Sequence, residues 1–494
     1  MQELTNRTLD RLPAAVQRPG YDRRVVTAGI AHIGVGNFHR THQAVYVDRC
    51  LHLPGHQAWG IVGIGLTNSA AGAEKAEVYR QQDGLYTVTE YDPQGQGSTR
   101  AIGAMVDYLH APNDPERVLA LLSSSAIRIV TLTITEGGYN IDEQTGTFRL
   151  NEPGVAHDLG GQPPITVFGF LVEALARRRA TGMLPFTIVS CDNLRHNGDT
   201  IRKAVVSFAA ARDADLAAWI DREAAFPNSM VDRIAPSVNS DDRQRLIEAS
   251  GINDGLPAMG ESYIQWVVED RFCNGRPDLG AVGVELRADV ALFEAAKGRI
   301  LNATHMMMAY PALLCGYRLV HEAMGDQRLR GFLLRFLSLD AIPLIEGPPG
   351  VSLQSYAETI LERFSNPAVG DQLLRIAQDG AAKIPVFHRE TLETLAATNG
   401  HLAREAFFLA CFARYFDGRD DNGASFDVVE PTFTAADRAT LRSDDGLGLL
   451  RTSPFGALQL DQNAGFMSAY RAAAAAIAAQ GVGASLEADG GRNW

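Results

Sequence analysis

Short apolar runs alternate with longer amphipathic stretches through the first part of the chain. The runs 59–66 (WGIVGIGL), 127–135 (IRIVTLTIT) and 185–193 (PFTIVSCDN) have the length and the β-branched content of buried strands. Between two of them, residues 167–180 have the periodicity of a helix. Because alternating strands and helices form βαβ units, we predict an α/β domain over residues 1–285, with a doubly wound and mainly parallel sheet.

The pattern of apolar positions changes near residue 285. Strand signals become rare, and stretches with a helical period of about 3.6 residues dominate; they are 329–337, 356–364, 370–378, 402–416 and 465–479. We therefore predict a mainly α-helical second domain over residues 286–494. The short run 230–234 is expected to form a further strand or turn, and 258–269 to continue the first sheet. The polar tail after Gly481 is expected to be loose.

The first strand of the chain, residues 29–36, ends in glycines and is followed by a helical pattern over 43–51. Gly34 permits a tight turn there, and Gly36 lets the backbone approach a pyrophosphate. The complete G-x-G-x-x-G fingerprint is absent, because His39 occupies the third glycine position. A G-x-G after a strand also occurs in ordinary turns. The order of strand, glycine turn and helix nevertheless favours a nucleotide site of the Rossmann type.

Polar side chains follow two other predicted strands of this domain. Thr135 and Glu136 come after one strand, and Asp192 and Asn193 come after another. Ligands of doubly wound sheets bind at the carboxyl ends of the strands, so these positions are candidates for the site. We interpret Asp192 as a local cap of backbone N–H groups and Asn193 as a functional residue.

One helix of the second domain carries polar residues in an apolar surrounding. The stretch 297–305 (KGRILNATH) contains Lys297, Asn302 and His305, and apolar residues flank it on both sides. At about 100° per residue, the three side chains fit on one half of an α-helix. Burial disfavours the charged form of a lysine and lowers its pKa toward the range useful for proton transfer. The alternative is a core helix whose polar groups are satisfied by the protein.

Composition and charge exclude several classes of function. The 494 residues carry a formal net charge of -13, and no basic run occurs, which argues against nucleic acid and anionic membranes as partners. No signal peptide and no stretch of about 18 apolar residues is present, so we expect a cytoplasmic protein. The five cysteines are scattered without a C-x-x-C pair, which disfavours disulfides and a zinc site. No metal and no partner protein is expected.

With these residues in place, the chain resembles the polyol-specific long-chain dehydrogenases, the mannitol dehydrogenase family. The motifs that carry the resemblance are 29–43 (GIAHIGVGNFHRTHQ), 131–139 (TLTITEGGY), 190–198 (SCDNLRHNG), 226–237 (FPNSMVDRIAPS), 297–305 and 365–387. They occur in the family's order over nearly the whole chain. The resemblance implies a Rossmann-type domain that binds a nicotinamide cofactor, a helical C-terminal domain, and interconversion of polyols and 2-ketoses without metal.

The resemblance also assigns roles to individual residues. Lys297 would be the general base, and Asn193 and Asn302 would bind the reacting oxygen. His305 would contact the sugar hydroxyls together with Arg375 and Lys383, and Glu294 would line the route by which the proton leaves. Candidate cofactor-binding residues are Gly34, Gly36, Asn37, Phe38, Asn68, Thr135 and Glu136.

The chain departs from the family pattern after the second strand. NAD-preferring members hold the adenosine ribose there with an acidic residue, whereas residues 67–73 (TNSAAGA) contain no carboxylate and no arginine. The cofactor is therefore NAD or NADP. Two alternatives to a polyol dehydrogenase remain: a hexuronate reductase of the same family, and a nucleotide-binding regulatory protein without turnover.

Overall fold

The computed structural model describes residues 1–142, 145–398, 400–443 and 445–487, except for the side chain of Glu136. It divides into two compact units, Met1–Ala291 and Leu292–Trp494. The division falls within helix α10 (Val290–Ala296), a few residues after the boundary that the sequence pattern predicts.

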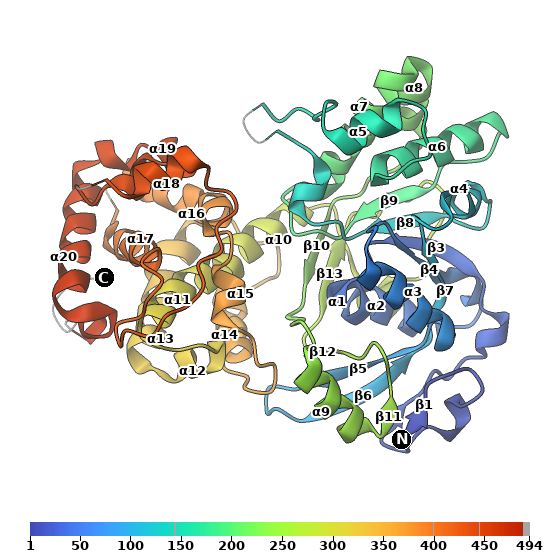
Figure 1. Cartoon of the computed structure of the whole chain (residues 1–494), viewed down its shortest axis with the longest axis horizontal. Coiled ribbons are helices and arrows are strands. Elements are labelled where there is room, and N and C mark those ends of the chain that lie inside the picture. The colour runs from blue at the N-terminus through green and yellow to red at the C-terminus, as the bar shows by residue number, and fades with distance from the viewer. Residues whose placement is uncertain (143–144, 399, 444, 488–494) are drawn as a thin grey trace. The chain divides into compact units, whose positions relative to one another are not determined.

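A five-stranded parallel sheet forms the centre of the first unit (Figure 1). Its order is β7 (Met105–His110), β4 (Gly60–Gly65), β3 (Ala28–Ile33), β8 (Ile129–Leu132) and β9 (Thr187–Ser190). All neighbouring strands are parallel. The chain enters this sheet at β3, continues outward through β4 and β7, and then returns to β8 and β9 on the other side of β3. This order confirms the doubly wound α/β prediction, and it places a topological switch point between β3 and β8, where such folds bind ligands.

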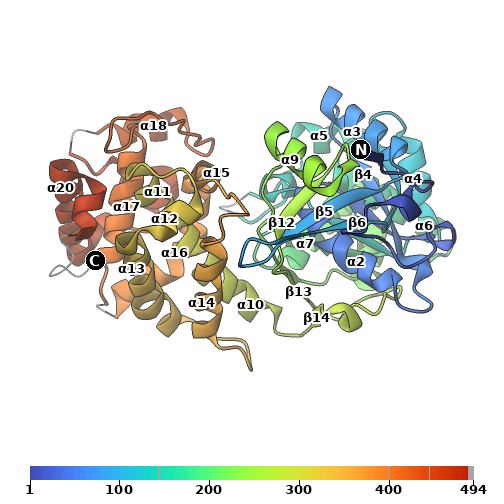
Figure 2. The same ribbon diagram turned by 90° about the horizontal axis from the view of Figure 1, so that it is seen from below.

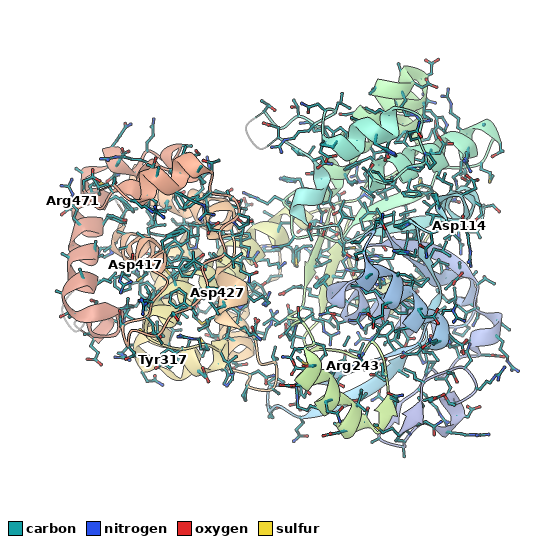
Figure 3. All side chains as sticks on the ribbon, in the orientation of Figure 1. Asp114, Arg243, Tyr317, Asp417, Asp427 and Arg471 are labelled. Carbon is teal, nitrogen blue, oxygen red and sulfur yellow. The ribbon has the colours of Figure 1, made fainter. Side chains whose placement is uncertain are left out.

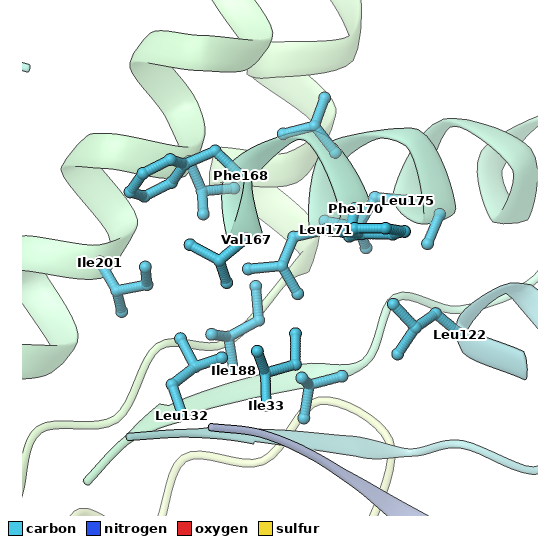
Figure 4. Packing of buried hydrophobic residues seen from close by; sticks show 14 of the residues in the cluster. Ile33, Leu122, Leu132, Val167, Phe168, Phe170, Leu171, Leu175, Ile188 and Ile201 are labelled. Atoms are coloured by element: carbon cyan, nitrogen blue, oxygen red, sulfur yellow. The ribbon is translucent and has the colours of Figure 1, made fainter. Parts of the chain in front are cut away.

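Helices cover this sheet, and buried apolar side chains pack between the helices and the strands. The helices of the first unit are α1 (Asn37–Thr41), α2 (Gln43–Leu51), α3 (Ala70–Gln81), α4 (Pro115–Ser123), α5 (Pro153–Leu159), α6 (Val167–Ala180), α7 (Asn197–Arg212), α8 (Ala214–Glu223) and α9 (Ser240–Ser250). Figure 4 shows Leu171 of α6 above Ile33 and Ile188 of the strands. Asp114, labelled in Figure 3, begins α4 by accepting the N–H of Arg117 at 2.9 Å.

The remaining strands of the first unit form smaller sheets. β12 (Ala258–Glu261), β5 (Tyr86–Tyr91), β6 (Gly97–Ile102) and β2 (Val16–Gln17) make one; β10 (Ser229–Asp232), β13 (Gln265–Val268) and β14 (Glu285–Leu286) make another; β1 (Gln2–Glu3) pairs with β11 (Ile252–Asn253). The strand predicted at 230–234 is thus present as β10. The prediction that 258–269 continues the parallel sheet is wrong, because β12 pairs with β5 and β13 pairs antiparallel with β10.

The second unit is helical, as predicted (Figure 2). Its helices are α11 (Ala303–Leu314), α12 (Val320–Gly325), α13 (Gln327–Arg335), α14 (Leu353–Phe364), α15 (Leu373–Ala377), α16 (Gly380–Ala397), α17 (Ala403–Tyr415), α18 (Ala435–Leu441), α19 (Ser453–Gly456) and α20 (Ala464–Glu487). The buried helix α11 packs against α13, α15, α16 and α17. The chain after Gly481 was expected to be loose, but α20 continues to Glu487 after a break at this glycine.

A buried carboxyl group in the second unit leads to a prediction about stability. Glu430 accepts the N–H of Ala381, near the start of α16, at 3.2 Å. Burial raises the pKa of Glu430 to about 8 from an ordinary value of 4.5, and nearby Asp379 adds to the rise. The folded unit therefore holds a proton that the unfolded chain releases. The associated stability is complete below about pH 4.5 and is lost as the pH rises through about 8.

Replacing Glu430 with glutamine should remove this pH dependence, because the amide keeps an acceptor for Ala381 and cannot ionise. Between about pH 5 and about pH 9, the unfolding temperature of the wild type should fall more than that of Glu430→Gln. Glu74→Gln, at an exposed position of α3, is the matched control. Equal losses in the wild type and in Glu430→Gln, measured by thermal denaturation, would contradict the assignment.

Candidate active site

The glycine turn follows β3 at the switch point of the sheet. Gly34 has a φ of 96°, and a Cβ atom there would lie 1.9 Å from the carbonyl oxygen of Thr133. Gly36 is different: the nearest protein atom to a Cβ at this position would be the carbonyl oxygen of Gly34, at 3.8 Å. The fold thus requires glycine at 34 but not at 36. Space kept beside Gly36 fits the close backbone approach of a dinucleotide.

A hydrogen-bond chain below the turn fixes the carbonyl group of Gly34. The hydroxyl of Thr133 donates to this oxygen at 2.6 Å. Thr133 therefore accepts from Nε2 of His32 at 3.0 Å, which leaves Nδ1 of His32 to accept from Thr131 at 2.7 Å. Burial lowers the pKa of His32 to about 3, so the ring is neutral. His39, at the position of the missing third glycine, stacks on His32 with ring centroids 3.5 Å apart.

The loop after β8 is held by an aspartate that follows the neighbouring strand β9. The Asp192 carboxylate accepts the N–H groups of Ile134 and Thr135 at 3.0 Å each, and the hydroxyl of Tyr139 at 2.7 Å. Asp192 therefore accepts backbone N–H groups, as interpreted, and these N–H groups belong to the loop after β8. Thr135 has a φ of 64°, a strained value for a β-branched residue that occurs most often near functional sites. The side chain of Glu136 lies outside the described part of the structure.

Other candidate residues of the first unit differ in what they contact. Asn37, the first residue of α1, donates through its amide to the carbonyl oxygen of Pro236 at 3.2 Å. Phe38 is half-buried beside it, and Asn68 is exposed in the loop between β4 and α3. Asn193 is exposed just after β9. Asn37, Asn68 and Asn193 thus all lie shortly after the carboxyl ends of strands.

The lysine of the second unit begins a π-helical segment, Lys297–Asn302, that continues α10 and leads into α11. Lys297 is buried, with 9% of its surface exposed. The helix expected here is present, but the angles derived for an α-helix do not apply, because i→i+5 hydrogen bonds put more residues into each turn. Such π-helical turns inside α-helices are frequent at functional sites.

Aromatic and polar contacts orient the rest of this helix. The ring of His305 stacks on Phe364 of α14, with centroids 3.9 Å apart. Asn302 precedes α11 without capping it through its side chain. Glu294, on α10 before Lys297, is buried. On the same segment, Arg299 donates to the hydroxyl of Thr391 on α16, which anchors the π-helical turn to its neighbour.

The two cations predicted to contact substrate are engaged by the second unit. Arg375 forms an ion pair with the buried carboxylate of Asp371 at 2.7 Å. The Lys383 ammonium donates to the carbonyl oxygen of Gln378 at 2.6 Å, beyond the end of α15. These acceptors were not predicted from the sequence. Asp371 stands four residues before Arg375, a spacing that can signal an ion pair when both residues lie on a helix.

Two further features bear on the classes considered from the sequence. Within the described ranges, no group of three or more His, Cys, Asp or Glu side chains is placed to hold a metal ion. In the same part of the chain, every helix is too short or too polar to cross a membrane.

A doubly wound unit with a glycine turn, followed by a helical unit with a buried lysine, is the architecture of two-domain nicotinamide-dependent dehydrogenases. Residues 28–281 match the Rossmann domain of mannitol dehydrogenase, and residues 289–478 match the C-terminal domain of mannitol dehydrogenase. The chain belongs to the mannitol dehydrogenase family. The resemblance seen in the sequence motifs is thus confirmed.

Similar proteins cover almost the whole chain. A polyol:NADP oxidoreductase of Gluconobacter oxydans is 48% identical over 454 residues, which are 92% of this chain and 93% of the relative. The structure of a mannitol 2-dehydrogenase of Pseudomonas fluorescens, in a ternary complex with NAD and D-mannitol, has a TM-score of 0.90, 38% identity and 99% coverage of both chains. A substrate-free D-sorbitol dehydrogenase has a TM-score of 0.89 and 44% identity, and the match covers 98% of this chain and 100% of that one.

Proposed function

We propose that the protein is an NAD(P)-dependent polyol dehydrogenase that interconverts a linear polyol and its 2-ketose. The single observation that carries the proposal is the buried Lys297 at the start of a π-helical turn, on the same helix as Asn302 and His305. A regulatory protein without turnover would have no chemical reason to bury a lysine there. The first unit binds the dinucleotide and contributes Asn193, and the second unit supplies the base and the other proposed substrate-binding residues.

The cofactor, when bound, supplies the hydride acceptor for alcohol oxidation and the hydride donor for ketose reduction. Gly34 and Gly36 let the backbone approach the pyrophosphate. Thr135, whose backbone is strained, and Glu136 are proposed to contact the cofactor as well. Asn37, Phe38 and Asn68 complete the set of cofactor-binding residues.

Lys297 accepts the hydroxyl proton of the polyol during oxidation, and in its protonated form it donates a proton to the ketose oxygen during reduction. The amides of Asn193 and Asn302 donate hydrogen bonds to the reacting oxygen, whose negative charge grows as the proton leaves. The buried Glu294 lines the route by which the proton reaches water. These roles require no metal, because side chains supply both the base and the donors.

His305 orients the sugar hydroxyls with a ring that Phe364 holds in place. Arg375 and Lys383 contribute further hydrogen bonds to the same hydroxyls. Their charges already have acceptors in the Asp371 carboxylate and the carbonyl of Gln378. This pairing favours a neutral polyol over a hexuronate, whose carboxylate would need a cation that is not already neutralised.

The purified protein should be tested with mannitol, sorbitol and arabinitol, with the corresponding ketoses, and with fructuronate, each in the presence of NAD(H) and of NADP(H). Absorbance of the reduced nicotinamide measures turnover directly. Turnover of a polyol and ketose pair that exceeds turnover of fructuronate supports the proposal. Efficient reduction of fructuronate with no oxidation of any polyol would identify a hexuronate reductase instead.

Chelators should leave the activity unchanged, because no proposed step uses a metal ion. The measurement is the rate of polyol oxidation before and after prolonged dialysis against EDTA. A matched sample dialysed without EDTA controls for loss of protein. Activity that disappears with EDTA and returns on addition of Zn²⁺ would overturn the proposed mechanism.

A further inference from the structure

A lysine that has no part in the proposed mechanism contacts the glycine turn. Lys75 lies on α3, which follows β4, and its ammonium donates to the carbonyl oxygen of Val35 at 2.7 Å. Val35 is the central residue of the turn between Gly34 and Gly36. The side chain is half-buried, so the ammonium is held at the turn rather than spread over the surface.

This ammonium keeps donors for a ligand. An ammonium has three N–H groups, and among the described residues only Val35 accepts one of them. Within the same ranges, Lys75 makes no ion pair. The first carboxylate of α3, Glu74, is exposed, and Glu77 is already bound by Arg80 at 2.9 Å.

The surroundings of Lys75 add positive charge and no compensating carboxylate. Arg40 is buried nearby and directs its guanidinium to the carbonyl oxygen of Leu256 and to Asn37. Within the part of the chain that the structure describes, Arg40 also lacks an ion pair. Burial lowers the pKa of Lys75, and the charge of Arg40 lowers it further. Two close cations without an acid partner form a region suited to an anion, because a buried charge is costly unless a counter-charge pairs with it.

The position of Lys75 indicates which part of the cofactor it would contact. In doubly wound folds, the adenosine ribose lies between the glycine turn and the end of the second strand, where an acid binds the 2′-hydroxyl or a cation binds a 2′-phosphate. Here the second strand is β4, and residues 67–73 after it contain no carboxylate. The ammonium of Lys75 reaches the turn from the helix that this loop begins. It therefore lies where a ribose 2′-phosphate would need a cation.

We propose that Lys75 is the residue that selects NADP(H) over NAD(H), by pairing with the 2′-phosphate of the adenosine ribose. The inference rests on the proposed function, since it assumes a dinucleotide on the first unit. A 2′-phosphate carries a charge of about -1.5 to -2, so a close ammonium favours NADP(H) by charge as well as by hydrogen bonds. This role is not apparent from the sequence, because Lys75 lies in α3, beyond the loop 67–73 where a cation for the 2′-phosphate is expected.

The test is equilibrium binding of NADPH and NADH to the full chain, followed by quenching of tryptophan fluorescence. We expect the wild type to bind NADPH at least about tenfold more tightly than NADH. Lys75→Met should weaken NADPH binding about tenfold or more and leave NADH binding unchanged, and Lys75→Arg should retain most of the preference. Lys203→Met, at an exposed lysine of α7 in the same unit, is the matched control and should change neither constant.

A second variant probes the same preference without altering the lysine. Ala70 is exposed at the start of α3, so Ala70→Asp should place a carboxylate at the ribose and shift binding toward NADH. Gly72 is unsuitable for this purpose, because a Cβ atom there would lie 2.7 Å from the carbonyl oxygen of Thr67.

Several results would overturn the proposal. A wild type that binds NADH as tightly as NADPH would do so, as would a Lys75→Met variant that loses both cofactors equally. The latter result would mean that Lys75 only supports the turn or binds the pyrophosphate. These measurements need no turnover, so failure of the proposed polyol activity would be distinguishable from failure of this inference.

Discussion

Replacing Lys297 with alanine is expected to lower kcat for polyol oxidation by roughly 10²-fold or more, the usual scale of a lost general acid–base group. The lysine must be neutral to accept a proton, and a free lysine titrates near 10.4, so wild-type oxidation should rise with pH in the alkaline range. Ketose reduction, which needs the protonated lysine, should fall over the same range. Steady-state rates in both directions as a function of pH measure this.

Two further variants separate catalysis from packing. Lys297→Met keeps the length and the apolar stem of a side chain that is 9% exposed, so it should fold normally and remain as inactive as Lys297→Ala. Cofactor binding should change little in either variant, because the proposed dinucleotide site is on the other unit. Small amines should restore part of the rate of Lys297→Ala. A Lys297→Ala enzyme with near-normal kcat and an unaltered pH profile would mean that the proton goes elsewhere.

Removal of a side chain that donates a hydrogen bond to the reacting oxygen should give a kinetic pattern different from that of Lys297→Ala. Asn302→Ala is expected to lower kcat/KM by about 10²-fold in both directions, the scale found when one preorganised donor to a developing oxyanion is lost. The shape of the pH profile should be retained, since an amide does not titrate and Lys297 is still present. Amines should not rescue this variant, because they replace a base and not a donor.

Asn193→Ala should reproduce the pattern of Asn302→Ala if the two amides share the reacting oxygen. Because both act on one oxygen, the double variant should lose less than the product of the two single losses. Asn422→Ala, at an exposed position of the second unit, is the control and should be silent. An Asn302→Ala enzyme whose only change is a higher KM would assign the amide to binding alone.

Local sequence patterns were sufficient to predict the fold class and the helix that carries Lys297, the proposed base. The runs 59–66, 127–135 and 185–193 contain β4, β8 and β9. Short apolar segments rich in β-branched residues are most readily buried as strands. The helical pattern over 167–180 coincides with α6. The same patterns could not predict that 258–269 would pair outside the parallel sheet, because the partner of a strand depends on contacts distant in the sequence.

Some features of the candidate site could likewise be predicted from the local sequence, and others could not. Residue type and spacing were enough to select Lys297, Asn302 and His305 as one group, since an apolar helix with three polar residues is visible in the sequence. The π-helical turn was not visible, because α- and π-helical hydrogen bonding leave nearly the same apolar pattern over six residues.

Only the tertiary structure decided which acceptors the charged side chains find. Asp192 receives its hydrogen bonds from the loop after β8, nearly sixty residues earlier in the chain. The contact of Lys75 with the carbonyl oxygen of Val35 joins α3 to the turn after β3, and no periodicity within either segment encodes it. Hydrophobic patterning determines which face of an element is buried. The hydrogen-bond partner of each polar group depends on how those faces pack together.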